Sequence, residues 1–542
     1  MQHTASRPRV DLPTMLLHWG MVLALLFSVS TGWRIAGMTE GHALWRWIDA
    51  LILQGNVVRW HFVSATLLTA LVVGYLVFLW RMGLAGRLSL RWASLRSPDR
   101  DTRWQALNKL VYWIAFALLA GAALTGSLMY FVPGAVPTEP LVQVHELLSW
   151  GFVVYIGLHV VAQVLLGGVR QLLKMVSPRL AYGLGAGFAL LAGLASAAVT
   201  YVADGGTLAT LKLVKVERAP MLDGDAGDAQ WARAPKITVH TARGFNLDGG
   251  EVAVEVQALH DADKAYFLFR WQDATRSQKH IPLQKTAGGW KLLHTNYYNN
   301  DENEFYEDKF AVMLARSPVA AGNAVRIGPK PLDDKPGPSN GLGLHVTTDG
   351  TLADVWHWKS VRSGAINQFD DNYFGAPMDA KPGRYTGGYT QDPKTGGGFE
   401  QNFEKIADSA FVKLKYLPQN LAAQQATMGR FDPDPNVSDD GMFAMARTAV
   451  VPYSAAADAA IAVGTVIPSV VYDKPFTGDR GDVSANAIWK GGWWTLEASR
   501  KLDTGSQFDL PISDGVYMWV AVFDHNQVRH TRHMRPLKLQ LE

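Results

Sequence analysis

The sequence of 542 residues contains no cysteine. Disulfides, iron–sulfur clusters, thiolate zinc sites and the Cys-x-x-Cys-His attachment of c-type haem are therefore excluded. The sequence also lacks a large excess of either charge, because it contains 51 Lys and Arg residues and 48 Asp and Glu residues. The resulting net charge of +3 gives no support to nucleic-acid binding. Any redox cofactor must therefore be held by His, Met, Lys or Tyr side chains.

Long apolar runs are confined to the first part of the chain, and none follows Val202. A membrane-spanning helix needs roughly 20 predominantly apolar residues. Five stretches meet this length, at about residues 15–35, 57–80, 111–132, 141–166 and 182–202. The first is long and lacks a small-residue cleavage site, so we expect a retained helix rather than a signal peptide. The fifth has no charge and no histidine, and we expect it to serve as a tether.

Lys and Arg residues in the short loops predict the orientation of these helices. Basic residues gather between the second and third spans and after the fourth, at Arg81, Arg87, Arg91, Arg96, Arg100, Arg103, Lys109, Arg170, Lys174 and Arg179. The connection between the third and fourth spans, PGAVPTEP, has none. We therefore expect a cytoplasmic N-terminus, with everything after about Tyr201 outside, which is the periplasm in a Gram-negative host.

Four histidines lie within the predicted spans: His18, His61, His145 and His159. His145 and His159 are fourteen residues apart, which puts them on one helix face and about 21 Å apart along the axis. By depth, His61 matches His145 near the outer surface, and His18 matches His159 toward the cytoplasm. Two imidazoles at each depth fit two six-coordinate b-type haems, whereas zinc needs three or four ligands at one depth. Hydrogen bonding to neighbouring helices would explain one or two of these histidines.

Four segments of this region resemble the helices of the di-haem cytochrome b561 family, which includes membrane subunits of nickel-iron hydrogenases and formate dehydrogenases. They are LLHWGMVLALLFSVSTGW, WHFVSATLL, LLAGAALTGSLMYF and VHELLSWGFVVYIGLHVVAQ, and the resemblance covers about residues 10–175. It implies haem b ligation by His18 with His159 and by His61 with His145. It also implies electron exchange with membrane quinone. Arg59 is a candidate partner for a haem propionate, or an interfacial arginine that snorkels.

The rest of the chain shows the alternation and turns of short β-strands. Residues 251–273 predict two strands around the turn HDADK. Further strand candidates are DKFAVML, LADVWHWKS, GGWWTLEASRKL and GVYMWVAVFD. Regular short strands predict an all-β antiparallel sandwich. The Gly- and Pro-rich residues 373–402 are expected to form a long surface loop.

Several motifs of this half together resemble the haem-binding domain of the ethylbenzene dehydrogenase γ-subunit family. They are DENEFYEDKFAVML, ADVWHWKSVRSG, DDNYFGAP and WKGGWWTLEASRKL. The opening LDGDAGDAQW is similar to the start of related carbohydrate-binding and DOMON-type sandwiches. The resemblance spans about residues 215–542. It implies one b-type haem with Met and Lys as axial ligands, while related electron-transfer sandwiches use Met and His.

Met313 occupies the place where the family's methionine is expected, although a strand methionine also serves as core filling. The histidine candidates for the opposing ligand are His530, His533, His345 and His357. His530 and His533 are equally explained as solvated histidines on an edge strand. Strand alternation puts His357 on the face opposite Trp356 and Trp358, so only one of those two sets forms the core. The Lys-type candidates are Lys309 and Lys490.

The sequence thus predicts three parts: a transmembrane four-helix di-haem bundle at residues 1–175, a fifth helix with linker at 176–212, and a periplasmic haem-binding β-sandwich at 213–542. We expect an inner-membrane tri-haem b-type cytochrome that passes electrons between the quinone pool and a periplasmic molybdenum enzyme or c-type cytochrome. In one alternative the outer domain is a haem-free sensor or carbohydrate-binding module, with Trp493 and Trp494 lining a groove. In another, the outer haem is five-coordinate and open to substrate.

Overall fold

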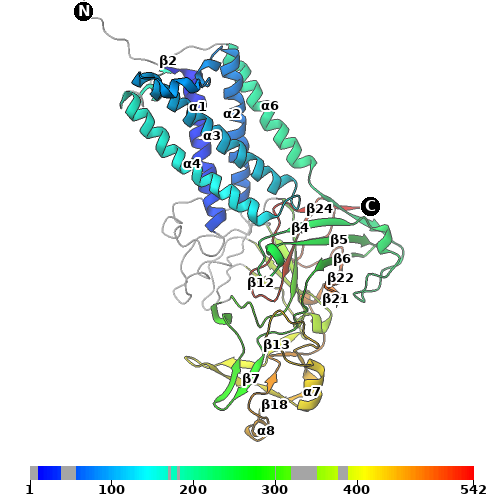
Figure 1. Ribbon diagram of the computed structural model, residues 1–542. Helices are drawn as coiled ribbons and strands as arrows, with labels where there is room; N and C mark the ends of the chain where they lie inside the picture. Colours follow the sequence, from blue (N-terminus) through cyan, green and yellow to red (C-terminus); the bar gives the residue numbers. More distant parts are fainter. Residues whose placement is uncertain are drawn as a thin grey trace, which may run out of the picture. The chain divides into compact units, whose positions relative to one another are not determined.

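The computed structural model describes residues 10–37, 57–168, 173–176, 178–179, 184–299, 301–318, 351–375 and 389–542. The chain divides into two compact units, a helical one that ends at Thr207 and a β-rich one that begins at Leu208. Figure 1 shows the helices of the first unit in blue to cyan-green and the strands of the second in green to red. The predicted division into an apolar helical part and a polar β part is confirmed.

Five helices of the first unit are long and apolar enough to cross a membrane. They are α1 Leu12–Gly37, α2 Val57–Arg81, α3 Arg100–Phe131, α4 Thr138–Gly167 and α6 Leu184–Gly206. The prediction of five spans is confirmed, and the chain is a multi-pass membrane protein. Helix α3 begins well before residue 111, where the apolar run starts, because Asp99 caps it and accepts a hydrogen bond from the Thr102 backbone N–H at 2.8 Å. A short parallel pair, β1 Val10–Asp11 with β2 Pro178–Arg179, completes the unit.

Helix α6 packs closely against α2 through small residues on both helices. A Cβ added at Gly74 of α2 would lie 2.9 Å from the Ala189 carbonyl oxygen of α6, and one added at Gly193 of α6 would lie 3.1 Å from the Ala70 carbonyl oxygen. Such close backbone approach is how small residues drive helix association in lipid. The fifth helix is therefore a packed member of the bundle, which the expectation of a tether did not include.

One 12-stranded sheet forms the framework of the second unit. Its order is β12-β11-β10-β9-β23-β24-β3-β5-β6-β22-β21, with β4 beside β5. The strands are β3 Thr210–Lys215, β4 Ile237–Thr241, β5 Val252–His260, β6 Lys264–Gln272, β9 Lys309–Ala315, β10 Ala353–Lys359, β11 Asp370–Phe374, β12 Thr390–Gln391, β21 Ser484–Lys490, β22 Trp493–Lys501, β23 Tyr517–Phe523 and β24 Leu537–Leu541. Strand β3 runs parallel to both β24 and β5, while the other described pairs of this sheet are antiparallel.

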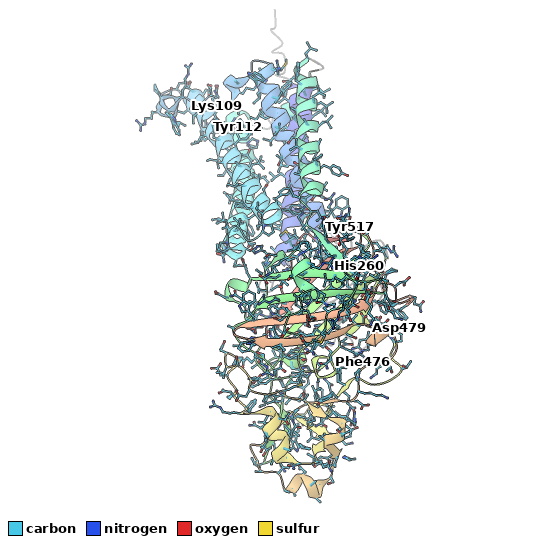
Figure 2. The ribbon with its side chains drawn as sticks, turned by 90° about the vertical axis from the view of Figure 1, so that its right-hand side faces the viewer. Lys109, Tyr112, His260, Phe476, Asp479 and Tyr517 are labelled. Atoms are coloured by element: carbon cyan, nitrogen blue, oxygen red, sulfur yellow. The ribbon has the colours of Figure 1, made fainter. Side chains whose placement is uncertain are left out.

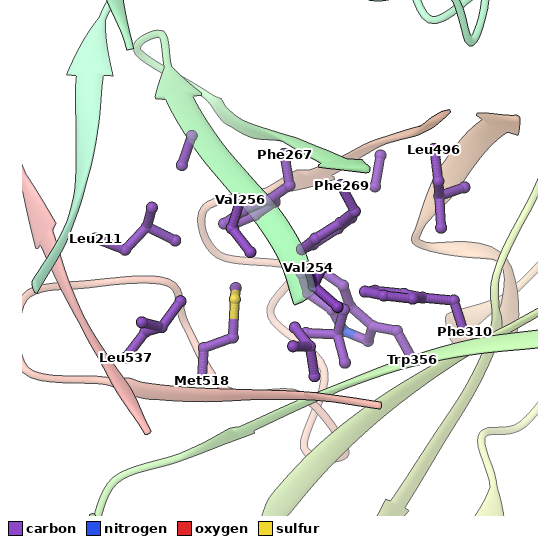
Figure 3. Close-up of a cluster of buried hydrophobic side chains, with 14 of the residues drawn as sticks. Leu211, Val254, Val256, Phe267, Phe269, Phe310, Trp356, Leu496, Met518 and Leu537 are labelled. Atoms are coloured by element: carbon purple, nitrogen blue, oxygen red, sulfur yellow. The ribbon is translucent and has the colours of Figure 1, made fainter. Parts of the chain in front are cut away.

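The sheet encloses one aromatic-rich core, shown in Figure 3. The Phe269 and Trp271 rings of β6 each lie 4.8 Å from the Phe310 ring of β9. The Phe267 ring lies 5.7 Å from the Trp356 ring of β10. Strands that are distant in the sheet order therefore face each other across the core, as in a β-sandwich. Burying each such ring contributes roughly 1.5–3 kcal/mol.

The strands expected from alternation are present. The predicted hairpin turns between β5 and β6, where Asp261 Oδ1 accepts from the backbone N–H groups of Asp263 and Lys264, both at 2.8 Å. In the LDGDAGDAQW segment, Glu497 of β22 accepts from the Gly224 N–H and from Trp231 Nε1, both at 2.7 Å. This segment is therefore fixed to the sheet.

A second lobe carries three smaller sheets and its own apolar clusters. Its elements are β7 Leu283–Thr286, β8 Gly289–Leu292, β13 Phe399–Gln401, β14 Phe403–Lys405, β15 Phe411–Leu414, β16 Tyr416–Pro418, β17 Met445–Ala446, β18 Val450–Pro452, β19 Val466–Ile467, β20 Val470–Tyr472, α7 Leu421–Met428 and α8 Ala455–Ala459. The expected surface loop at residues 373–402 is only partly one, because β12 and β13 lie within it. Residues 376–388 of that stretch lie outside the described residues.

Candidate cofactor sites

The four membrane histidines meet as two pairs, each joining α4 to a different helix. The ring centres of His18 (α1) and His159 (α4) are 6.3 Å apart, and those of His61 (α2) and His145 (α4) are 6.1 Å apart. Imidazoles bound to opposite faces of one iron have ring centres about 6 Å apart, because each nitrogen lies about 2 Å from the metal. Both pairs therefore fit axial ligation of a haem, in the pairing that depth predicted.

A threonine fixes the tautomer of His145. Thr125 Oγ1 donates its proton to the Gly121 carbonyl at 2.8 Å and lies 2.8 Å from His145 Nδ1. Because the hydroxyl proton is already used, the ring must donate from Nδ1–H, which leaves the Nε2 lone pair available for a metal. Thr125 lies in LLAGAALTGSLMYF, one of the segments that resemble the cytochrome b561 helices.

His61 is held in the same way from α1. Its Nδ1 lies 3.1 Å from Thr31 Oγ1 and 3.0 Å from the Ser28 carbonyl oxygen. Thr31 Oγ1 in turn donates to the Phe27 carbonyl at 2.9 Å. The hydrogen-bond acceptors again place the proton on Nδ1, so both imidazoles of this pair present Nε2.

Glycines next to both threonines make room for the rings. A Cβ added at Gly32 would lie 3.3 Å from His61 Cε1, and one added at Gly126 would lie 3.3 Å from His145 Cε1. A larger side chain at either position would displace the imidazole. The Thr-Gly dipeptide is therefore a unit in which one residue orients the histidine and the next admits it.

The sequence spacing of the site residues in the helix pair α1–α2 recurs, with some residues replaced, in the helix pair α3–α4. His18 precedes Thr31 by thirteen residues, and Tyr112 precedes Thr125 by the same number. Likewise, Tyr75 follows His61 by fourteen residues, the spacing from His145 to His159. Tyr112, labelled near Lys109 in Figure 2, has its ring centre 5.6 Å from that of His159. Tyrosines thus occupy two of the four equivalent positions around the His18–His159 pair.

The environment of the His18–His159 pair differs from that of the other pair. Nδ1 of both rings is buried and has no hydrogen-bond partner among the described residues. Tyr155 stacks on His159 with ring centres 5.6 Å apart. Aromatic contacts, rather than hydrogen bonds, therefore position these imidazoles.

Arg59 forms an ion pair within the helical unit. Its Nη1 lies 2.9 Å from Asp204 Oδ2 of α6, and the Tyr130 hydroxyl donates to Asp204 Oδ1 at 2.9 Å. Its side chain remains about one-third exposed. The sequence alternatives were a propionate partner or a snorkelling residue, and neither anticipated this contact.

In the β unit, Met313 lies on the sheet face that points away from the aromatic core. Directly opposite pairs share a face, and Met313 pairs with Val355 of β10 and Trp519 of β23. Ala311 of β9 similarly pairs with His357 and Ala521. We call these six residues the Met313 face. Met313 and Tyr389 pack against the apolar cluster that includes Val355, Phe374 and Trp519.

His357 contributes a buried, unpartnered nitrogen to this face. Its Nδ1 lies 3.3 Å from the Tyr389 hydroxyl, whereas Nε2 is buried with no hydrogen-bond partner among the described residues. Burial, and then the positive charges of Lys359 and Lys309, hold the His357 pKa well below its ordinary value. The neutral ring is the form that binds metals. Of the two alternatives that strand alternation left open, the structure has Trp356 and Trp358 in the core and His357 on the opposite face.

The other predicted ligands differ in how their donor atoms are used. His530 packs on Phe523, with ring centres 4.8 Å apart, and Phe523 stacks on His357 at 5.1 Å. Both nitrogens of His533 meet backbone groups, since Nε2 accepts from the Val520 N–H at 2.9 Å and Nδ1 lies 2.7 Å from the Arg535 carbonyl oxygen. His345 lies outside the described residues.

The two lysine candidates are separated by the fold. Lys309 stands on the same face of β9 as Met313, where its Nζ donates to the Gln527 carbonyl at 2.8 Å. Because both side chains leave the same strand on the same side, they cannot approach one iron from opposite faces. Lys490 is exposed at the end of β21.

A separate cavity of about 370 Å³ lies beside the core. Its lining includes Trp358, Trp489, Trp494, Arg276, Gln278 and Asn486. Trp494 is 3% exposed and belongs to the core, so it does not form an open stacking platform. Trp493 is partly exposed, and Arg270 lies over its ring at 5.4 Å.

Comparisons with known proteins agree with this division. The family model of prokaryotic cytochrome b561 matches residues 9–178, and that of ethylbenzene dehydrogenase matches residues 228–535. No curated protein matches the chain.

Among solved structures, a family 9 carbohydrate-binding module from Caldicellulosiruptor kristjanssonii in complex with glucose is 8% identical, with 61% of this chain and 95% of that chain covered and a TM-score of 0.25. A protein from Bacteroides uniformis, described as a candidate carbohydrate-binding protein, is 6% identical, with 62% and 100% covered and a TM-score of 0.25.

The ethylbenzene dehydrogenase model covers more than half of the chain, and the cytochrome b561 model covers the helices that bring the histidine pairs together. A prokaryotic cytochrome b561 domain implies b-type haem and electron transfer in the membrane. The chain therefore belongs to the ethylbenzene dehydrogenase family and carries a prokaryotic cytochrome b561 domain at its N-terminal end.

Proposed function

We propose that the protein is a tri-haem electron carrier that connects the membrane quinone pool to a redox partner in the periplasm. The observation that carries this proposal is the pair of matched imidazole sites, with ring separations of 6.3 and 6.1 Å, on four membrane helices. Bound haem iron supplies one-electron transfer by alternating between its ferric and ferrous states. The chain's residues hold, orient and separate the two sites.

His145 and His159 set the distance between the membrane sites. Their spacing of fourteen residues along α4 separates the two ligation levels by about 21 Å. One site therefore lies toward each side of the membrane, and together they form a path for electrons through lipid. The basic loops after α2 and α4 support a cytoplasmic N-terminus and a periplasmic β unit.

We further propose that the Met313 face would hold the third haem, with the Met313 sulfur as one ligand of its iron. Ala311 and Ala521 support this because they are small residues in the row of the sheet next to that of Met313. Since His357 shares the face with Met313, an opposing ligand must come from a segment that covers the face. His530, His533 and His345 are the histidines to test for that role.

The first test is the number of haems per chain in the purified full-length protein, measured by pyridine haemochrome. Three b-type haems are expected, and two in Met313→Ala. Single alanine variants of His345, His530 and His533 then identify the opposing ligand as the one whose replacement converts a six-coordinate spectrum to a five-coordinate one. Two haems in the wild type, unchanged in Met313→Ala, would contradict the third site while leaving the membrane pairs intact.

Electron exchange with quinone is tested by mixing the oxidised protein in nanodiscs with a quinol analogue. We expect the haem to be reduced rapidly, which is seen as the appearance of the α-band. Protection of the β unit from added protease in right-side-out vesicles would contradict the proposed orientation.

A second candidate function keeps the membrane sites but makes the β unit a haem-free binding or sensing module. The cavity beside Trp358 and Trp489 favours it, because it combines aromatic rings with polar groups such as Gln278. A haem count of two and a measurable affinity for oligosaccharides would support this candidate.

A further inference from the structure

An acidic cluster lies where β10, β11 and the loop before β23 meet. Asp354, Asp371 and Asp509 each offer a carboxylate oxygen, and these three atoms lie within 4.8 Å of one another. Asp354 and Asp371 are 0% exposed and Asp509 is 5% exposed. Asp392, directly after β12, is also buried, and its backbone N–H donates to the Asp371 carbonyl at 3.1 Å.

The protein's own donors reach only one oxygen of each of the three clustered carboxylates. Those bonds run to Asp354 Oδ2 from Arg500 Nη1 and from the Leu510 N–H at 3.0 Å, to Asp371 Oδ1 from the Asn372 N–H at 3.0 Å, and to Asp509 Oδ2 from Thr504 Oγ1 at 2.6 Å. The remaining oxygens are buried and have no hydrogen-bond partner among the described residues: Asp354 Oδ1, Asp371 Oδ2, Asp509 Oδ1 and both oxygens of Asp392.

A second acidic cluster in the same unit offers a comparison, although Asp273, which acts on Asp308, also has one buried oxygen without a hydrogen-bond partner among the described residues. Asp308, Asp524 and His525 also lie within ligand distance of one another. There, however, both oxygens of Asp308 are satisfied, by N–H donors from Ser277 at 2.7 Å, Trp494 at 3.2 Å and His525 at 3.1 Å. Hydrogen bonds satisfy both oxygens of the Asp308 carboxylate without a bound ion. In the Asp354 cluster, by contrast, five carboxylate oxygens have no hydrogen-bond donor among the described residues.

The charge of the Asp354 cluster is not balanced by the protein. Among the described residues, Arg500 is the cation that forms an ion pair with the cluster, through Asp354, and the nearby carboxylates of Asp479 and Asp482 add negative charge. Burial and the neighbouring carboxylates raise the pKa of Asp354 to about 6 and that of Asp392 to about 8. Unpaired buried carboxylates cost several kcal/mol each, so protons or a bound cation must neutralise them.

We propose that Asp354, Asp371, Asp392 and Asp509 bind one Ca²⁺. Ca²⁺ takes oxygen ligands at about 2.3–2.6 Å, so ligand oxygens of one ion lie at most about 5 Å apart, and the oxygens of Asp354, Asp371 and Asp509 lie within that limit. The four side chains offer only oxygen, whereas structural zinc sites use nitrogen and sulfur. Mg²⁺ gives up its water ligands reluctantly, which disfavours it among buried carboxylates.

The ion would join four segments that are distant in the sequence. Asp354 and Asp371 come from neighbouring strands, Asp392 follows β12, and Asp509 belongs to the loop before β23. Asp354 points to the same side of β10 as Trp356, two residues away, and so to the side opposite His357. A bound ion would therefore link β10 to its neighbours on the side of the sheet opposite the Met313 face.

The test uses the full-length protein in non-ionic detergent, stripped with chelator and then equilibrated with Ca²⁺. Elemental analysis after gel filtration should find one Ca²⁺ per chain, and a hundredfold excess over Kd should raise the Tm by about 5 °C. Asp371→Asn and Asp509→Asn should lose both effects. Asp408→Asn is the matched control, since Asp408 is exposed and at φ 54°, a conformation that Asn accepts readily.

The control should bind one Ca²⁺ like the wild type, and tenfold more Mg²⁺ should not displace the ion. Circular dichroism reports whether each variant is folded. If Asp371→Asn is unfolded without ligand, the number of Ca²⁺ ions bound per wild-type chain still decides whether the site exists. A wild-type protein without bound Ca²⁺ at millimolar Ca²⁺, or a folded Asp371→Asn that binds as the wild type does, would overturn the site. These measurements do not depend on the haem content of either unit.

Discussion

Replacing Thr125 by Val isolates the hydrogen bond that orients His145. The two side chains are nearly equal in size, so the change removes the hydroxyl and little else. His145 Nδ1–H then loses the hydroxyl oxygen at 2.8 Å and is left with the Ala122 carbonyl. A buried donor left without any acceptor costs about 1–3 kcal/mol, which is the upper limit here. The hydrogen bond gives the ring partial imidazolate character, which stabilises ferric iron, so its loss should raise the midpoint potential.

If the hydrogen bond stabilises the ferric state by about 1 kcal/mol more than the ferrous state, its removal raises the one-electron midpoint potential by about 40 mV. Thr31→Val is the matched control, because His61 retains the Ser28 carbonyl as an acceptor at 3.0 Å. We expect its shift to be clearly smaller, although Thr31 serves the partner ligand of the same iron.

The assay is a potentiometric titration of the α-band in nanodiscs, with the haem content of each variant measured beforehand. One titration step should move upward in Thr125→Val, and the steps of the other haems should stay in place. An unchanged potential in a fully loaded Thr125→Val would refute the orienting role. Equal shifts in both variants would refute the reasoning about the second acceptor of His61.

Three further predictions concern the same sites and the acidic cluster. His159→Ala should lose one haem and keep that of the His61–His145 pair, which a pyridine haemochrome count checks; unchanged haem content would contradict the assignment. Gly126→Leu should lose the haem held by His145, because even a Cβ there lies 3.3 Å from the ring, while Gly157→Leu on α4 should not, since a Cβ there meets nothing within 4 Å. In metal-free buffer the free energy of unfolding should fall between about pH 4 and pH 8, because the folded pKa of Asp392, about 8, lies above its ordinary value of 3.8 and the folded state binds the extra proton. Ca²⁺ should remove that fall in denaturant titrations at several pH values, and a pH-independent stability without the ion would contradict the shift.

Much of the membrane unit could be predicted because its signals are local and periodic. Hydropathy gave the five spans, and helical periodicity with depth gave the pairing of His18 with His159 and of His61 with His145. The Thr125–His145 hydrogen bond could not be predicted in that way, because it joins two helices whose rotation about their axes is set by packing. The repeat of thirteen and fourteen residues was, however, visible in the sequence, and it would have pointed to Thr31, Thr125, Tyr75 and Tyr112.

The β unit was less predictable because its contacts join distant segments. Alternation gave the strands and the side of β10 on which His357 stands. It could not show that β3 pairs parallel with β24 and β5, since register depends on the whole sheet. The acidic cluster was also missed: Asp354, Asp371, Asp392 and Asp509 are scattered over more than 150 residues of sequence, and no single stretch resembles a calcium loop.

The use of different partner helices by the two histidine pairs has a geometric consequence. A macrocycle lies perpendicular to the axis that joins its two axial nitrogens. In one pair that axis runs from α4 to α1, and in the other from α4 to α2. Haems held by the two pairs would therefore have planes turned relative to each other, because His18 of α1 completes one pair and His61 of α2 completes the other. Oriented multilayers examined by electron paramagnetic resonance would show two distinct in-plane directions of the haem normals.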